Sequence, residues 1–189
     1  MNLKEAKKLY FAYDGSSFGM TRECVLDQYR EAKVPPEVEA AWLEELTRDK
    51  LRLLSRRGDF MPLHFLMDHG NLGHLAEAVQ AVPQGPRSSQ CAFFGLLLDY
   101  ANRVKRAGGD PSLVARAARK AIAAAEPMLR RAKAKEPIDR IQGILDRARR
   151  LLDEVEAGGG SSGAVKKTTY MKSEGPPGVG PGSRSTRKR

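Results

Sequence analysis

Apolar residues recur every three or four positions over most of residues 1–157, and this spacing is typical of amphipathic helices. Glycine, proline and N-capping residues divide the pattern into segments joined by short connections. Aromatic residues are only 6% of the chain, whereas Ala, Leu, Arg and Glu are abundant, and this balance favours helices over strands. The sequence therefore predicts an all-α protein, either a helical bundle or a short α-solenoid of about seven helices.

The most apolar stretch, Ser88–Gly109, is predicted to be the central helix of the core. Its apolar residues leave almost no polar face over four turns: Cys91, Ala92, Phe93, Phe94, Leu96, Leu97, Leu98, Tyr100, Ala101 and Val104. A helix that is apolar all round must be buried on all sides. Phe94 and the single tryptophan, Trp42, are expected to be core anchors.

Two helix starts are predicted from residues whose side chains can accept a hydrogen bond from an unpaired helical amide. Thr21 is predicted to cap a helix that extends to about Lys33, and Asn71 to cap a helix that ends at Pro83. Both segments place apolar residues at helical spacing after the cap.

Two prolines give predictions for the last two helices. Pro127 falls inside the helix that starts at Pro111, so a kink near residues 123–126 or a division into two helices is expected. Glu136 and Pro137 are predicted to start the final helix, which has the apolar stripe Ile138, Ile141, Leu145, Ala148, Leu152 and Val155.

Residues 158–189 differ in composition from the all-α globular domain predicted over residues 1–157. They are rich in Gly, Pro and Ser, and carry seven basic residues and one acidic residue, so they hold six of the ten net positive charges. A segment with so little apolar surface cannot offset the entropy of ordering its chain. It is predicted to be a disordered basic tail.

The chain opens with charged residues, and no apolar run is long enough for a signal peptide or a membrane span. A cytoplasmic protein without a membrane role is expected. Cys24 and Cys91 lie far apart and form no C-x-x-C pair, so both are predicted to be buried free thiols. The sequence does not predict an oligomeric state.

All three histidines fall within eleven residues, with an aspartate among them: His64, Asp68, His69 and His74. Asp68 follows His64 by four positions, which places both side chains on one face of a helix. Imidazole and carboxylate so arranged are ligands for zinc, iron or manganese. The alternative is that these residues are the end of an ordinary helix, where His69 complements the helix dipole.

Basic residues also follow one side of the helix after Pro111, namely Arg116, Arg119, Lys120, Arg130 and Arg131. Such a stripe fits nucleic-acid phosphates or an acidic partner. The alternative is a solvated face on which Glu126 pairs with Arg130. Tail residues Lys166, Lys167, Arg187, Lys188 and Arg189 are further candidates for contacts with nucleic acid.

No catalytic motif or cofactor fingerprint is recognised in the chain. The first hypothesis is therefore a non-enzymatic protein-interaction or scaffold domain that offers a groove between helices to a protein partner. The second is a nucleic-acid-associated accessory protein that uses the tail and the basic stripe. The third is a metal-dependent enzyme centred on the histidine cluster.

Overall fold

The computed structural model describes residues 1–57, 59–132 and 138–158, and these residues form nine helices and no strand. The helices are α1 (Leu3–Ala12), α2 (Ser17–Arg22), α3 (Leu26–Glu31), α4 (Pro36–Arg57), α5 (Met61–Asp68), α6 (Leu75–Gln80), α7 (Arg87–Arg106), α8 (Pro111–Arg130) and α9 (Ile138–Gly158). The all-α prediction is confirmed for this part of the chain. The predicted tail lies outside the described residues, except for Gly158, which ends α9.

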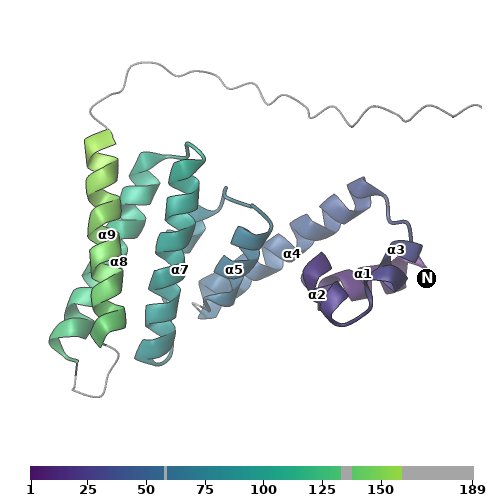
Figure 1. The fold of residues 1–189 in the computed structure, drawn as a ribbon, viewed down its shortest axis with the longest axis horizontal. Coiled ribbons are helices and arrows are strands. Elements are labelled where there is room, and N and C mark those ends of the chain that lie inside the picture. The colour runs from purple at the N-terminus through teal and green to yellow at the C-terminus, as the bar shows by residue number, and fades with distance from the viewer. Residues whose placement is uncertain (58, 133–137, 159–189) are drawn as a thin grey trace, which may run out of the picture.

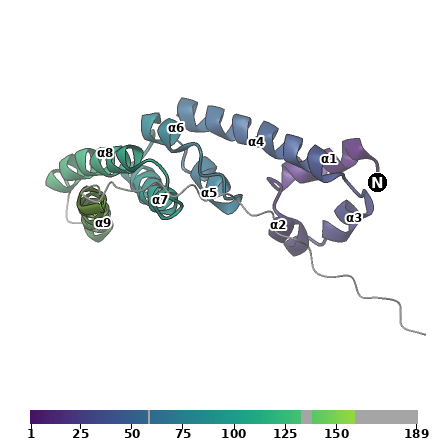
Figure 2. The same ribbon diagram turned by 90° about the horizontal axis from the view of Figure 1, so that it is seen from above.

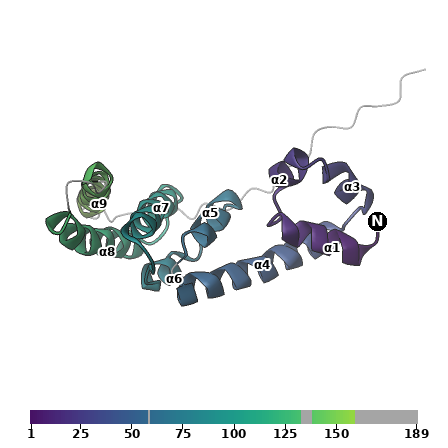
Figure 3. The ribbon, with the colours of Figure 1, turned by 90° about the horizontal axis from the view of Figure 1, so that it is seen from below.

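The molecule is elongated, and its helices follow one another along the long axis. α1, α2 and α3 lie at one end, the long helix α4 crosses the middle, and α7, α8 and α9 stand side by side at the other end (Figure 1). The views from above and below show the same order, with α5 and α6 between α4 and α7 (Figures 2 and 3). Neighbours in sequence are thus neighbours in space, which is the arrangement of a short α-solenoid.

α7 is the helix on which α5, α6, α8 and α9 all pack. Its buried residues are Cys91, Phe93, Phe94, Leu97, Leu98, Tyr100, Ala101 and Val104. The expectation that this helix is buried on every side is wrong for one face, where Ala92, Gly95 and Leu96 are half-buried and Asp99 is exposed. Phe94 and Trp42 are buried, as predicted.

Ion pairs between the three C-terminal helices show in which direction each helix runs relative to the others. Asp99 and Lys105 of α7 pair with Arg147 and Glu154 of α9, and both sets of numbers rise together, so these two helices run parallel. Between α8 and α9, Arg119 pairs with Glu156 at 3.0 Å, and Glu126 pairs with Arg149 at 3.3 Å. These numbers run in opposite directions, so α8 is antiparallel to both neighbours.

The helix predicted from Thr21 to Lys33 is two short helices, α2 and α3. Cys24 lies between them and has φ of 59°. This left-handed backbone conformation ends a helix, and residues other than glycine rarely adopt it. Thr21 is not an N-cap, because its hydroxyl donates to the carbonyl of Ser17 inside α2. Ser16 caps this helix instead, accepting a hydrogen bond of 3.1 Å from the amide of Gly19.

Of the two outcomes predicted at Pro127, a kink or a division, the division does not occur, since α8 is one helix from Pro111 to Arg130. It ends soon after the proline. The predicted start of the last helix at Glu136 and Pro137 lies outside the described residues. Within α9, Ile141, Leu145 and Ala148 of the predicted stripe are buried.

Cys24 is exposed and Cys91 is buried, and both are free thiols. The prediction of free thiols is confirmed, whereas the prediction that both are buried is wrong for Cys24. Its exposure follows from its position in the turn between α2 and α3. Over the described ranges, no helix has the length and apolar character needed to cross a bilayer.

Tyr100 fixes the connection between α5 and α6. Its side chain is fully buried, and its hydroxyl donates to the carbonyl of Asn71 at 2.7 Å and accepts from the amide of His74 at 3.2 Å. Asn71 therefore does not cap a helix as predicted, because its carbonyl faces α7 and α6 begins only at Leu75. Burial raises the pKa of the Tyr100 phenol to about 12.

We expect Phe93→Ala to lower the free energy of unfolding by about 3–5 kcal/mol, because it removes a ring that is 0% exposed and packs edge-on against Phe94. Phe18→Ala is the matched control, because the Phe18 ring is 77% exposed and its loss should change stability by less than about 0.5 kcal/mol. Urea unfolding followed by circular dichroism measures both. Equal losses in the two variants would mean that α7 is not the core helix.

Tyr100→Phe should cost about 1–3 kcal/mol at neutral pH, because the Asn71 carbonyl and the His74 amide each lose their partner. The phenol ionises at about pH 10 in the unfolded chain and has a folded pKa of about 12, so it stabilises the fold below pH 10. Between pH 10 and 12 the parent should lose about 1.4 kcal/mol per pH unit through this group. The gap between parent and variant should therefore narrow over that range, and a constant gap in urea unfolding would contradict the argument.

Candidate functional site

The four residues predicted to bind a metal do not form one site. His64 and Asp68 are exposed on α5. The Nε2 atom of His69 lies 2.7 Å from the carbonyl oxygen of Asp14, and the Nδ1 atom of His74 lies 3.2 Å from a carboxylate oxygen of Glu77. In the described part of the chain, no three His, Cys, Asp or Glu side chains lie close enough to hold one ion.

The turn at Gly70, with φ of 62°, is the physical reason for this separation. α5 ends at Asp68, His69 caps it, and the turn at Gly70 follows. The next residues, 71–74, pass beside α7, where Tyr100 makes hydrogen bonds to Asn71 and His74. His74 consequently stands at the start of α6 rather than on the helix that carries His64.

The predicted basic stripe of α8 is divided by its neighbours. Arg116 is exposed, Arg119 pairs with Glu156, and Lys120 turns toward α6. Glu126 pairs with Arg149 and not with Arg130 as predicted. The tail candidates Lys166, Lys167, Arg187, Lys188 and Arg189 lie outside the described residues.

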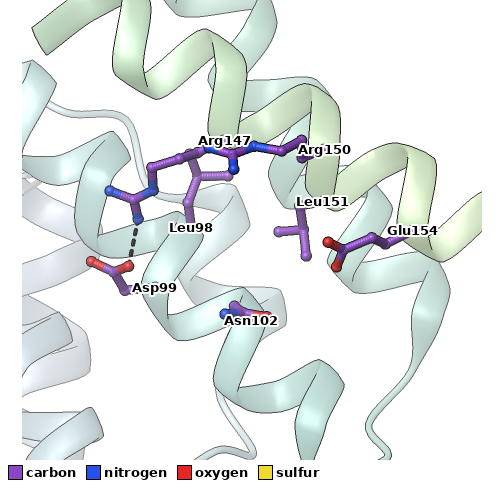
Figure 4. A pocket seen from close by; sticks show the side chains of 7 residues that line it. All are labelled: Leu98, Asp99, Asn102, Arg147, Arg150, Leu151 and Glu154. Carbon is purple, nitrogen blue, oxygen red and sulfur yellow. Dashed lines mark hydrogen bonds and ion pairs between the residues drawn. The ribbon is translucent and has the colours of Figure 1, made fainter.

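Grooves between the described helices differ in the charges of their linings. The pocket between α7 and α9, of about 200 Å³, contains both acidic and basic side chains, and Arg147 points at Asp99 across it (Figure 4). Three grooves that border α1 or α4 also mix the two signs, as with Glu44 and Arg48 beside α4. Each of these linings therefore holds charges of both signs.

The fifth groove, which we name the α8 groove, has basic residues and no acidic residue among its described lining residues. It has a volume of about 540 Å³ and lies between the connection from α6 to α7, the first turns of α7, and the second half of α8. Its lining residues are Val82, Pro83, Arg87, Gln90, Phe94, Lys120, Ala123, Ala124, Pro127, Met128 and Arg131. We call the apolar side chains of α7 and α8 in this lining the floor, and its three basic side chains, Arg87, Lys120 and Arg131, the rim.

Lys120 is the most constrained cation of the groove. Its ammonium donates to the carbonyls of Val79 and Ala81, the last acceptors of α6, which have no partner further along that helix. Burial lowers the pKa of Lys120, and none of the described carboxylates pairs with it. An ammonium has three donors, so one remains for a further acceptor.

Arg87 and Arg131 stand at the other end of the groove. Arg87 donates to the backbone carbonyl of Arg131 at 3.3 Å and so joins the start of α7 to the end of α8. The Arg131 side chain is exposed, and its guanidinium makes no ion pair with any described residue. It is therefore available to an anion from solution.

Pro127 contributes a backbone acceptor to the same surface. Proline has no N–H, so it cannot donate to the carbonyl of Ala123 four residues earlier. Ala123 is exposed and both residues line the groove. The groove thus combines an apolar floor, cations and a carbonyl that lacks its usual intrahelical donor.

Comparison with known proteins adds no further information on this site, because no protein-family model, curated protein or solved structure matches the chain.

Charge periodicity identified two residues of the groove, Lys120 and Arg131, but missed its apolar part. Val82 and Pro83 fall where the sequence predicts a helix end and a loop, and Phe94 was assigned to the core. Val82 is 62% exposed, because α6 ends at Gln80 and Val82 lies in the connection that follows. Sequence periodicity does not report which residues of a connection stay exposed.

Lys120→Met should lower the free energy of unfolding by about 1–2 kcal/mol, because two carbonyls at the end of α6 lose their charged donor. Arg116→Met, on the exposed face of the same helix, should change stability by less than about 0.5 kcal/mol. Thermal unfolding of the two variants beside the parent measures the difference. If both variants melt like the parent, Lys120 does not hold α6 in place.

Proposed function

We propose that this chain is a non-enzymatic helical interaction protein that holds a segment of a partner protein in the α8 groove. The observation that supports this proposal is the apolar, cation-rimmed groove along the packed helices α7 and α8. A groove of this size suits a short segment rather than the face of a globular domain. The proposal keeps the expectation of a cytoplasmic protein.

The packing of the groove walls supports binding. These walls are held by the buried face of α7 and by the Lys120 contacts to α6, so the groove is already formed without a partner. A preformed site loses less conformational entropy on association than a mobile one. The groove is open at Val82 and Ala123, both exposed, so a segment can enter it from the side.

The two other functions remain predictions without a supporting observation in the described residues. Nucleic-acid binding is predicted to use the basic tail, which lies outside the described residues, and the stripe on α8, in which Arg119 and Lys120 are engaged within the fold. Metal-dependent catalysis is predicted from the histidine cluster, in which His69 contacts Asp14 and His74 contacts Glu77 instead of a shared ion.

We expect Ala123→Trp to abolish partner binding, because an indole on an exposed position of the groove wall fills the space that a partner segment needs. Ala41→Trp is the matched control, since Ala41 is an exposed alanine on α4 outside the groove. Full-length proteins are used as bait in cell extract, a retained protein is purified, and its dissociation constant is measured for all three forms. At least a tenfold loss in the groove variant alone is expected.

The proposed function fails if every retained protein binds the parent and Ala123→Trp equally well. It also fails if Ala41→Trp weakens binding as much, because the loss would then reflect a general effect of an added indole.

A further inference from the structure

Resting on the proposed function, we infer that the α8 groove binds an extended, acidic and apolar segment, in which two carboxylates meet Lys120 and Arg131 and an apolar side chain between them covers the floor. The occupant is a partner protein and not a part of the described chain. Four observations, taken in turn, lead to this inference.

The first observation is the charge at Lys120. A partly buried ammonium that is satisfied by carbonyls alone carries an uncompensated charge, which costs free energy. A carboxylate from a ligand uses the third donor of this ammonium and compensates its charge. The four grooves described above contain carboxylates in their linings, so their basic side chains have an acidic neighbour and an added anion would be less favourable there.

The second observation is the spacing of the cations. Lys120 and Arg131 are eleven positions apart on α8, and a helix rises about 1.5 Å per residue, so their backbones stand about 16 Å apart. An extended chain advances about 3.3 Å per residue. Two acidic residues four positions apart span about 13 Å, point to the same side, and lie within reach of the long basic side chains.

The third observation is the surface between the cations. Ala124, Pro127 and Met128 lie between Lys120 and Arg131 on α8, and Phe94 faces them from α7. The middle residue of a segment with acids at the first and fifth positions points to the same side as the acids. An apolar side chain at this third position therefore meets the apolar floor.

The fourth observation distinguishes a peptide from other apolar anions such as a fatty acid. The Ala123 carbonyl has no donor from Pro127, and both residues line the groove. A peptide N–H can donate to this carbonyl, whereas an alkyl chain cannot. Burying that carbonyl under an alkyl chain would leave it unpaired at a cost.

The test uses the full chain and a fluorescent peptide, Gly-Ser-Glu-Ser-Leu-Ser-Glu-Ser-Gly, with binding measured by fluorescence anisotropy in 50 mM NaCl. Replacing both glutamates by glutamine should weaken binding at least tenfold. Arg131→Glu should also weaken it at least tenfold. Arg116→Glu, the same charge change on an exposed residue of α8 outside the groove, should change it less than twofold.

Raising NaCl to 300 mM should weaken binding of the acidic peptide more than that of its glutamine counterpart, because salt screens the ion pairs only. Equal affinity of the two peptides overturns the inference. So does a loss in Arg116→Glu that matches the loss in Arg131→Glu, and so does displacement of the peptide by decanoate at a lower concentration than unlabelled peptide requires.

These outcomes are separate from failure of the proposed function. A partner whose binding is lost in Ala123→Trp, together with equal binding of the acidic and glutamine peptides, leaves the interaction role intact and removes only the acidic segment. The absence of any groove-dependent partner removes the interaction role itself.

Discussion

Burial of α7 is the constraint on which most of the structure depends, because four other helices pack on this one. The same helix places the Tyr100 hydroxyl where it holds residues 71–74, and so decides where α6 begins. The end of α6 in turn supplies the two carbonyls that hold Lys120. The shape of the candidate site is therefore a consequence of how the core packs, although none of its cations belongs to the core.

Lys120 shows how one side chain serves the fold and the site together. Its donors satisfy helix-end carbonyls, which stabilises the packing of α6 on α8, while burial penalises its charge. The hydrogen bonds keep Lys120 in place. The cost of its buried charge makes the binding of an anion beside it favourable. Arg131, exposed at the end of the same helix, adds charge without this cost.

A nearly continuous apolar run predicted α7, which contains Tyr100. Hydrophobic periodicity predicted the helical class and most of the other long helices, because each has a buried face that the spacing of apolar residues reports. It did not predict the break at Cys24, since a left-handed residue other than glycine has no sequence signature. Periodicity also predicted the side of α8 on which Lys120 and Arg119 lie. It did not predict that they would contact Val79 and Glu156, which belong to other helices. The site combines segments that are about 40 residues apart, and this proximity arises only from tertiary packing.

The two cysteines differ in their reactivity and in their place along the molecule. Cys91 is buried, and burial raises the pKa of its thiol, so little thiolate forms there near neutral pH. Cys24 is exposed in the turn between α2 and α3, at the end of the molecule far from α8 (Figure 1). A maleimide dye will therefore label the native sequence at a single place, remote from the α8 groove, without any engineered cysteine.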